Sequence, residues 1–262
     1  MTASDDSTPI VPSVSPVPPL RPKVQPKPLA PVTDPDLYQC SVALATISGA
    51  DVCMELTQQL WEIKNHTTPV RIDGWIPQPS GPYLDDSRNA TVQSFRREFP
   101  NTDWLLCVDS DIWHPDLYSQ IVLLLRTGMY LGAQLIGGSY LGHYHGNIST
   151  IAARWVNRPD GIAELVNVTK EEVETHDDTV PVDVIGTGFL AIHSTLLERM
   201  AHTFAPPQVW FDEPVWHYGG QDIHFGEDWA FCLKAAELGI RPLLHRGVRL
   251  IHKKTIGLTY TA

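Results

Sequence analysis

The chain has 262 residues, a formal net charge of −11 and a hydrophobic content of 43%, which is enough apolar material for one sizeable domain. The acidic charge argues against general nucleic-acid binding, which needs clustered lysine and arginine. No apolar run is long enough to span a bilayer and no N-terminal stretch has a signal-peptide pattern, so we expect a cytoplasmic protein, in the host cytoplasm if it is viral.

The first 36 residues differ from the rest in composition. Prolines recur every few residues from Pro9 to Pro35, a pattern typical of polyproline or disordered segments. We therefore predict a disordered proline-rich tail over residues 1–36 and a single domain over residues 37–262.

Strand-like and helix-like patterns alternate after this tail. Apolar runs predict strands at 40–47, 69–76, 104–108 and 133–136, with a loop at 77–82. Helical spacing predicts helices at 52–65, 86–99 and 115–127, the second of them capped by Asp85 or Asp86. This alternation indicates an α/β fold with a mostly parallel central sheet flanked by helices on both faces.

The second half is less regular. The turn sequence R-P-D-G at 158–161 predicts a hairpin over 151–168, and 182–192 is interpreted as a strand interrupted by two glycines. Helices are expected at 194–203, capped by Ser194, and at 228–238, closed by Gly239 in the left-handed conformation. Residues 205–226 are interpreted as an ordered loop, and 241–252 as one last strand or two short ones.

The apolar run W-L-L-C-V at 104–108 leads directly into two aspartates, Asp109 and Asp111. Ligands of such sheets bind beyond the carboxyl ends of the strands, and residues two apart in extended chain point to one side. Two neighbouring carboxylates repel unless a cation lies between them, and oxygen ligands without cysteine indicate Mg²⁺ or Mn²⁺. The alternative is that Asp109 caps a turn and Asp111 caps the following helix.

The segment L-L-C-V-D-S-D-I resembles the D-x-D segment of glycosyltransferases of the GT-A fold, in particular bacterial and phage members. Three further stretches agree in order: D-S-R-N at 86–89, V-I-G-T-G-F-L-A at 184–191, and G-E-D-W-A-F-C at 226–232 followed by L-I-H at 250–252. The likeness covers about residues 38–257. It implies a Rossmann-like sheet and transfer of a sugar from a nucleotide-sugar donor, most commonly a UDP-sugar.

By this resemblance, Asp111 would ligate a manganese or magnesium ion that bridges the donor diphosphate, and His252 would complete the metal site. Asp109 would contact the ribose, or the metal through water. The donor-binding residues that the resemblance implies are Thr46, Ser48, Arg88, Asp109, Gly186 and Gly188.

The acid pair of G-E-D would supply the catalytic carboxylates. Asp228 matches the acid that takes the acceptor proton in inverting members, with Glu227 as a weaker candidate, although both also suit the start of a helix. Retaining enzymes carry similar acids, so the stereochemistry stays open. Trp210, Trp216 and His217 lie in an aromatic segment interpreted as the acceptor pocket, or alternatively as filling for a gap in the core.

Several readings compete with this one. G-T-G-F-L-A at 186–191 fits a dinucleotide-loop pattern, but strand character continues through it, so we reject that match. His143 and His145 form a weak candidate zinc pair. A nucleotidyltransferase, a non-catalytic carbohydrate-binding module and a nucleotide-sugar hydrolase are the functional alternatives. The expected acceptor is a glycan, a protein or a modified DNA base.

Overall fold

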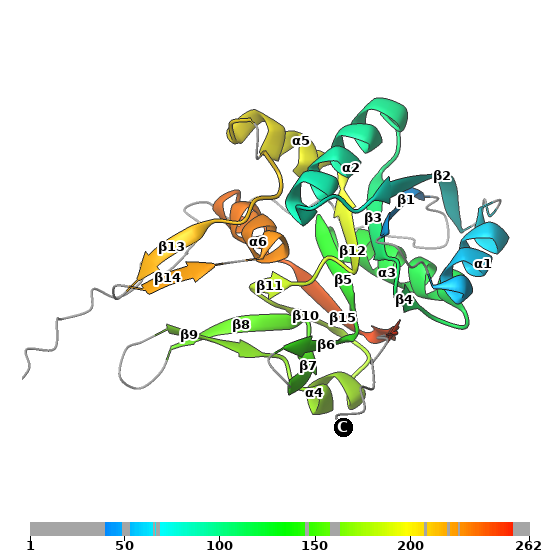
Figure 1. The fold of residues 1–262 in the computed structure, drawn as a ribbon. Helices are drawn as coiled ribbons and strands as arrows, with labels where there is room; N and C mark the ends of the chain where they lie inside the picture. The colour runs from blue at the N-terminus through cyan, green and yellow to red at the C-terminus, as the bar shows by residue number, and fades with distance from the viewer. Residues whose placement is uncertain are drawn as a thin grey trace, which may run out of the picture.

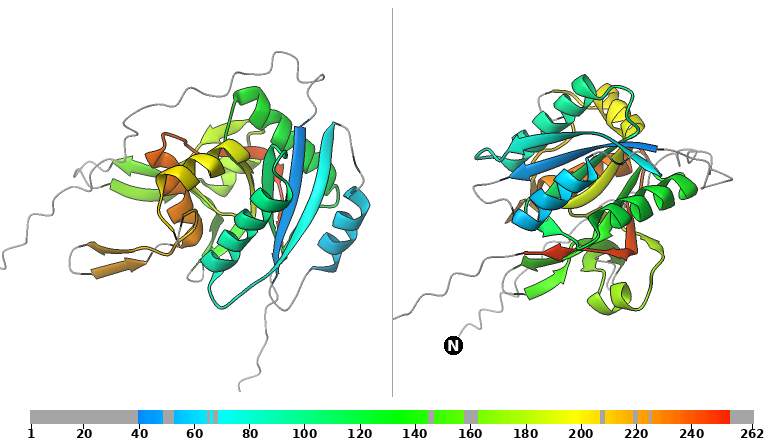
Figure 2. Two further views of the ribbon diagram at one scale, coloured as in Figure 1. Left: turned by 90° about the horizontal axis from the view of Figure 1, so that it is seen from above. Right: turned by 90° about the vertical axis from the view of Figure 1, so that its right-hand side faces the viewer.

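The computed structural model describes residues 40–48, 53–64, 66, 69–144, 147–157, 163–206, 209–218, 221–224 and 226–253. The predicted tail and the R-P-D-G turn lie outside these residues. The described chain forms a central sheet between two groups of helices (Figure 1). Seen edge-on, α2 and α5 lie on one side of the strands and α1 and α3 on the other (Figure 2).

The central sheet has seven strands in the order β10-β15-β5-β12-β3-β1-β2. Five share one direction, while β12 runs against its neighbours β3 and β5, and β10 runs against β15. This confirms the predicted α/β architecture with a mostly parallel sheet. The strands are β1 (Cys40–Ser48), β2 (Val70–Pro79), β3 (Trp104–Asp109), β5 (Leu135–Ser139), β10 (Thr179–Pro181), β12 (Phe189–His193) and β15 (Leu243–Arg249).

Strand β2 runs three residues further than predicted, through Pro77 and Pro79. Proline removes a backbone donor and is tolerated in strands at a sheet edge, and β2 is an edge strand. By contrast, β3 lies inside the sheet and its apolar residues are buried on both faces, as its continuous apolar run predicts.

The helices are α1 (Met54–Ile63), α2 (Leu84–Glu98), α3 (Leu117–Leu131), α4 (Lys170–Glu174), α5 (Ser194–Thr203) and α6 (Glu227–Glu237). Their caps differ from the predictions. Tyr83 is the N-cap of α2, so the acids expected there lie inside its first turn. The ring of His193, not Ser194, caps α5 by accepting the Thr195 N–H. Gly239, at φ 75°, follows α6 in the predicted left-handed conformation.

Smaller sheets complete the structure. The predicted hairpin is formed by β8 (Ala152–Asn157) and β9 (Ala163–Asn167), and β11 (Val184–Ile185) pairs with β8. The strand predicted at 182–192 is therefore two strands in two different sheets, β11 and β12. The segment interpreted as a loop at 205–226 contains the hairpin β13 (Val215–Tyr218) and β14 (Gln221–His224), which extends away from the central sheet in Figure 1.

Two further strand pairs border the carboxyl edge of the sheet: β4 (Ile112–Trp113) with β16 (Ile251–His252), and β6 (Leu141–Tyr144) with β7 (Asn147–Thr150). The segment 241–252 thus contains two strands, β15 and β16, rather than one, which was one of the two alternatives predicted. Within the part of the chain that the structure describes, no helix has the length and apolarity needed to cross a membrane.

Candidate functional site

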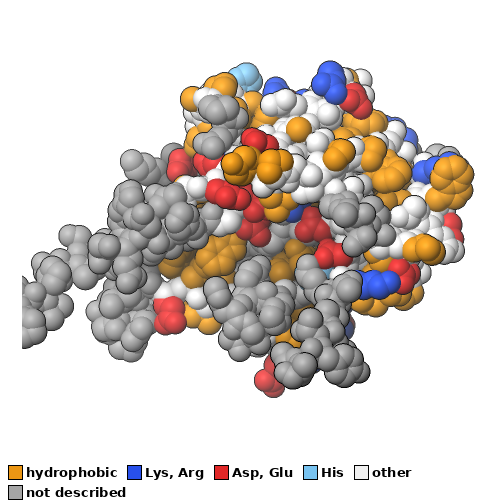
Figure 3. Space-filling view, viewed as in Figure 1, with side chains coloured by type: hydrophobic (Ala, Val, Ile, Leu, Met, Phe, Trp, Pro, Cys, Tyr) orange, Lys and Arg blue, Asp and Glu red, His pale blue; other side chains and the backbone are white. Residues whose placement is uncertain are grey.

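The candidate site lies where β1, β3 and β5 end. Because these strands are parallel, Ser48, Asp109 and Ser139 come to the same edge of the sheet, and the reversed strand β12 begins there. Acidic side chains gather in the middle of the face shown in Figure 3.

Arg88 of α2 is the buried centre of one cluster, with only 3% of its side chain exposed. Its Nη2 donates to Oδ1 of Asp109 at 3.0 Å, and its Nε donates to Oε1 of Glu227 at 3.2 Å. One guanidinium thus pairs with acids from β3 and α6, which lie 21 and 139 residues away in the sequence. Arg88, which the resemblance assigned to donor binding, therefore contacts two acids of the site.

Removing this guanidinium is expected to be costly for stability. We expect Arg88→Met to lower the free energy of unfolding by about 3 kcal/mol, because it leaves the buried Glu227 and the partly exposed Asp109 without their ion-pair partner. The matched control is Arg97→Met on the same helix, whose partner Glu98 is exposed, and a loss below about 1 kcal/mol is expected there. Urea denaturation measures both, and equal losses would contradict the central role of Arg88.

The D-S-D segment is not an extended strand with two carboxylates on one side. Strand β3 ends at Asp109 and Ser110–Asp111 form a turn, so the two aspartates have different partners. Asp109 pairs with Arg88, and Asp111 pairs with His252. The described residues contain no group of three or more metal-binding side chains. The alternative in which Asp111 caps the next helix is also wrong, because Asp116 caps α3.

The His252 ring contacts two acceptors. Its Nδ1 lies 2.7 Å from the carbonyl oxygen of Leu141, and its Nε2 lies 3.1 Å from Oδ2 of Asp111. A carbonyl only accepts, so Nδ1 carries a hydrogen and the other nitrogen faces a carboxylate. Nε2 and the Asp111 carboxylate can then be joined by a proton, as in an ion pair, or by a metal ion that both side chains bind. A histidine whose second nitrogen donates to a backbone carbonyl is the usual form of a metal ligand.

These two side chains therefore fit a divalent ion. Mg²⁺ and similar ions are commonly held by one or two protein side chains while substrate phosphates and water supply the remaining oxygens. Strand pairing fixes the geometry: His252 lies opposite Ile112, and the Lys253 N–H donates to the Asp111 carbonyl at 2.8 Å. Residues 141 positions apart are thus brought together by two short strands.

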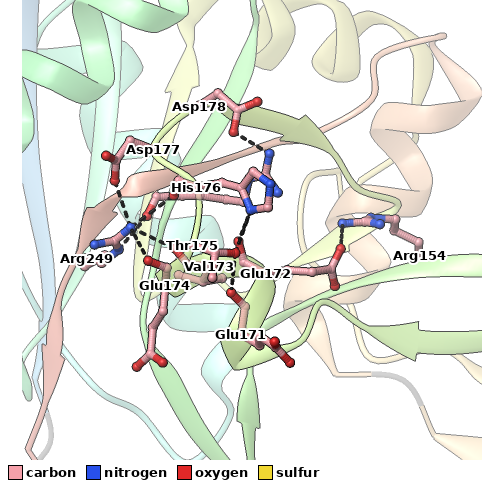
Figure 4. Close-up of polar contacts among 11 residues, drawn as sticks. Arg154, Glu171, Glu172, Val173, Glu174, Thr175, His176, Asp177, Asp178 and Arg249 are labelled. Atoms are coloured by element: carbon pink, nitrogen blue, oxygen red, sulfur yellow. Dashed lines mark hydrogen bonds and ion pairs between the residues drawn. The ribbon is translucent and has the colours of Figure 1, made fainter.

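Strand β16 is only two residues long, and Arg249 anchors the chain just before it (Figure 4). Its Nη2 lies 2.8 Å from the Val173 carbonyl, 3.0 Å from the His176 carbonyl and 2.8 Å from Oδ1 of Asp177. The segment around α4 thereby sets where β16 begins and where His252 lies. Local sequence patterns do not predict this anchor, because its partners lie more than 70 residues away.

Asp228 begins the other side of the site. Burial, and next the negative charge of Glu227, raise the pKa of Asp228 to about 7. Its Oδ1 accepts the backbone N–H of Trp229 at 2.8 Å, at the start of α6. A carboxyl that titrates near neutral pH is suited to accept a proton from a hydroxyl. Glu227, in contrast, is buried and occupied by Arg88.

Tyr140 joins these clusters and was missed by the sequence analysis. Its hydroxyl accepts the Gly188 N–H at 2.8 Å, and its ring meets the His252 ring edge-on at 5.4 Å. A methyl group on Gly186 would lie 2.8 Å from this hydroxyl, and one on Gly188 would collide with it. Gly186 and Gly188, which the resemblance assigned to donor binding, thus make room for Tyr140. The position of Tyr140 directly after β5, at the carboxyl edge of the sheet, is the sequence feature that could have identified it as a site residue.

The residues predicted for the nucleotide lie at the end of β1. Thr46 is buried, and its hydroxyl accepts the indole N–H of Trp75 at 2.8 Å. Ser48 is half-buried, and its carbonyl accepts the Ser80 N–H at 2.8 Å. Trp75 remains 46% exposed, so an aromatic side chain that the sequence analysis did not single out borders this region.

The three residues predicted for the acceptor do not form one group in the structure. Trp210 is buried and donates its indole N–H to the Leu197 carbonyl at 3.0 Å, so it belongs to the core, as the alternative interpretation had it. The side chain of Asn89 holds the adjacent backbone of Phe211 by two hydrogen bonds. Trp216 and His217 lie in β13, but their side chains are outside the described part, as are those of the candidate zinc pair His143 and His145.

No family model matches this sequence, and no curated protein matches it. Similar solved structures include A197 from STIV, which is 14% identical over 85% of this chain and 98% of that chain, with a TM-score of 0.49. GalNAc-T7, solved with UDP, GalNAc and Mn²⁺, is 12% identical over 81% of this chain and 43% of that chain, with a TM-score of 0.44. A glycosyltransferase involved in the glycosylation of the major capsid of PBCV-1 is 16% identical over 64% of this chain and 69% of that chain, with a TM-score of 0.32.

Proposed function

We propose that this protein is a metal-dependent glycosyltransferase that moves a sugar from a nucleoside-diphosphate sugar, with a UDP-sugar as the preferred donor, to a hydroxyl acceptor. The observation that supports the proposal is the Asp111–His252 pair, in which a carboxylate oxygen and an imidazole nitrogen face each other at 3.1 Å, as two ligands of one metal ion would. Its place beyond the carboxyl ends of parallel strands is where such sheets bind their ligands.

The bound ion would offset the charge that builds on the departing nucleoside diphosphate. Asp228 is proposed as the base that takes the acceptor proton in an inverting transfer, because its pKa of about 7 lets it exchange a proton at neutral pH. Arg88, which also pairs with Glu227, holds the carboxylate of Asp109 in place. The proposed acceptor is a glycan, a protein or a modified base, bound near β13 through Trp216 and His217.

Thermal melting tests the donor site. The wild-type protein is melted with UDP, GDP and their sugars, with and without Mn²⁺, because a ligand that binds only the folded state raises the melting temperature. A rise with one nucleotide that requires metal is expected, and it names the donor base. A rise with free sugars alone, independent of metal, would favour the carbohydrate-binding module and contradict the transferase.

A further inference from the structure

A lysine stands directly beside the Asp111–His252 pair. Lys253 follows His252, its backbone N–H donates to the Asp111 carbonyl at 2.8 Å, and its side chain is 54% exposed. Its Nζ lies 2.8 Å and 3.1 Å from the two carboxylate oxygens of Glu55, in the first turn of α1. The Cys53 N–H, just before α1, donates to the Ser110 carbonyl at 2.8 Å. Lys253, Glu55 and the D-S-D turn therefore form one contiguous unit.

The charge of this edge is unfavourable for a diphosphate. Asp109, Asp111, Glu227 and Asp228 bring four carboxyl groups to the site, and the buried Arg88 is committed to two of them. A nucleoside diphosphate adds further negative charge, of which a divalent ion offsets a part. Lys253 differs from Arg88 because it is exposed and its partner Glu55 lies at the surface.

We propose that Lys253 binds the diphosphate of the donor and that it exchanges Glu55 for phosphate oxygens when the donor binds. This inference rests on the proposed function and names a residue for it. The ammonium is a mobile point charge with three donors, which suits phosphate oxygens. An exposed ion pair contributes little to stability, so exchanging the partner costs little. Because the Lys253 backbone N–H is hydrogen-bonded to the Asp111 carbonyl, the ammonium group remains near the Asp111–His252 pair.

Calorimetric titration of the protein with UDP in the presence of Mn²⁺ tests this exchange. GDP replaces UDP if thermal melting shows that GDP is the nucleotide that stabilises the protein. We expect Lys253→Met to weaken nucleotide binding by about tenfold or more, since it removes hydrogen bonds to a charged group. Glu55→Gln removes the competing carboxylate and should tighten binding by about threefold. Lys253→Arg keeps the charge and should restore most of the affinity.

Lys64→Met is the matched control, because Lys64 also lies at the surface but sits over the Trp61 ring instead of the D-S-D turn. It should leave nucleotide affinity unchanged. If the wild type binds the nucleotide and Lys253→Met binds it equally well, the inference is overturned while the proposed function stands. If Glu55→Gln weakens binding, the exchange is overturned. If the wild type binds no nucleotide with metal, both the proposed function and this inference fail.

Discussion

Replacing Asp228 with asparagine is expected to lower the rate of sugar transfer by about 100- to 10,000-fold, the usual contribution of a positioned general base. Asparagine has nearly the same shape, and its side-chain oxygen can still accept the Trp229 N–H that Asp228 accepts at the start of α6. The change therefore removes the proton acceptor and leaves the helix start in place. Steady-state kinetics with the donor identified by melting would measure the effect.

The pH profile makes this prediction specific. Only the ionised carboxylate can take a proton, and the pKa of Asp228 is about 7, so wild-type kcat/KM should rise with pH and level off above neutrality. The exposed acid Glu237 lies at the other end of α6, and Glu237→Gln should leave both the rate and the profile unchanged. Transfer within about threefold of wild type in Asp228→Asn would show that this acid only begins the helix.

The same group links pH to stability in a defined direction. Burial raises the pKa of Asp228 in the folded protein, so the folded state holds this proton more tightly than the unfolded chain. Its contribution to stability is therefore fully present below the ordinary aspartate pKa and is lost as pH rises through about 7. Asp228→Asn should remove this part of the pH dependence in urea denaturation, which checks the pKa without any substrate.

Elements whose signal lies in consecutive residues were predictable. Strands β1 and β3 and helix α1 were predicted within two residues of their observed ends, because hydrophobic periodicity is a local property. The direction of β12 was not predictable in this way. Its residues read as strand whichever way they run, and only pairing with β3 and β5 shows the reversal.

In the site, too, some residues were predictable from the sequence and others were not. The resemblance pointed to Asp111, His252 and Asp228, and the structure brings the first two into contact. The resemblance did not predict the ion pair between Asp109 and Arg88, because that pair depends on how α2 packs against the sheet. Tyr140 had no motif of its own, and its role depends on glycines 46 and 48 residues further along the chain.

Asp109 and Asp111 have different partners in the structure, and this difference leads to a second large expected effect. With UDP present, Asp111→Ala and His252→Ala should each weaken Mn²⁺ binding by at least about 100-fold, because residues that only hydrogen-bond to metal ligands already contribute about 10- to 100-fold. Mn²⁺ binding is followed directly by electron paramagnetic resonance, in which free and bound ions differ in signal. This measurement needs neither an acceptor nor turnover.

Asp109→Asn tests whether only Asp111, or both aspartates of the D-x-D motif, bind the metal. If both aspartates hold the metal, Asp109→Asn should weaken Mn²⁺ binding as strongly as Asp111→Ala. In the structure Asp109 instead accepts from Arg88 at 3.0 Å, so we expect Asp109→Asn to retain Mn²⁺ affinity and to lower stability. Asp116→Ala serves as the control, because it removes the N-cap of α3, about 1 kcal/mol, without touching the pair. Equal loss of Mn²⁺ in the Asp109 and Asp111 variants would mean that Asp109 leaves Arg88 when the metal binds.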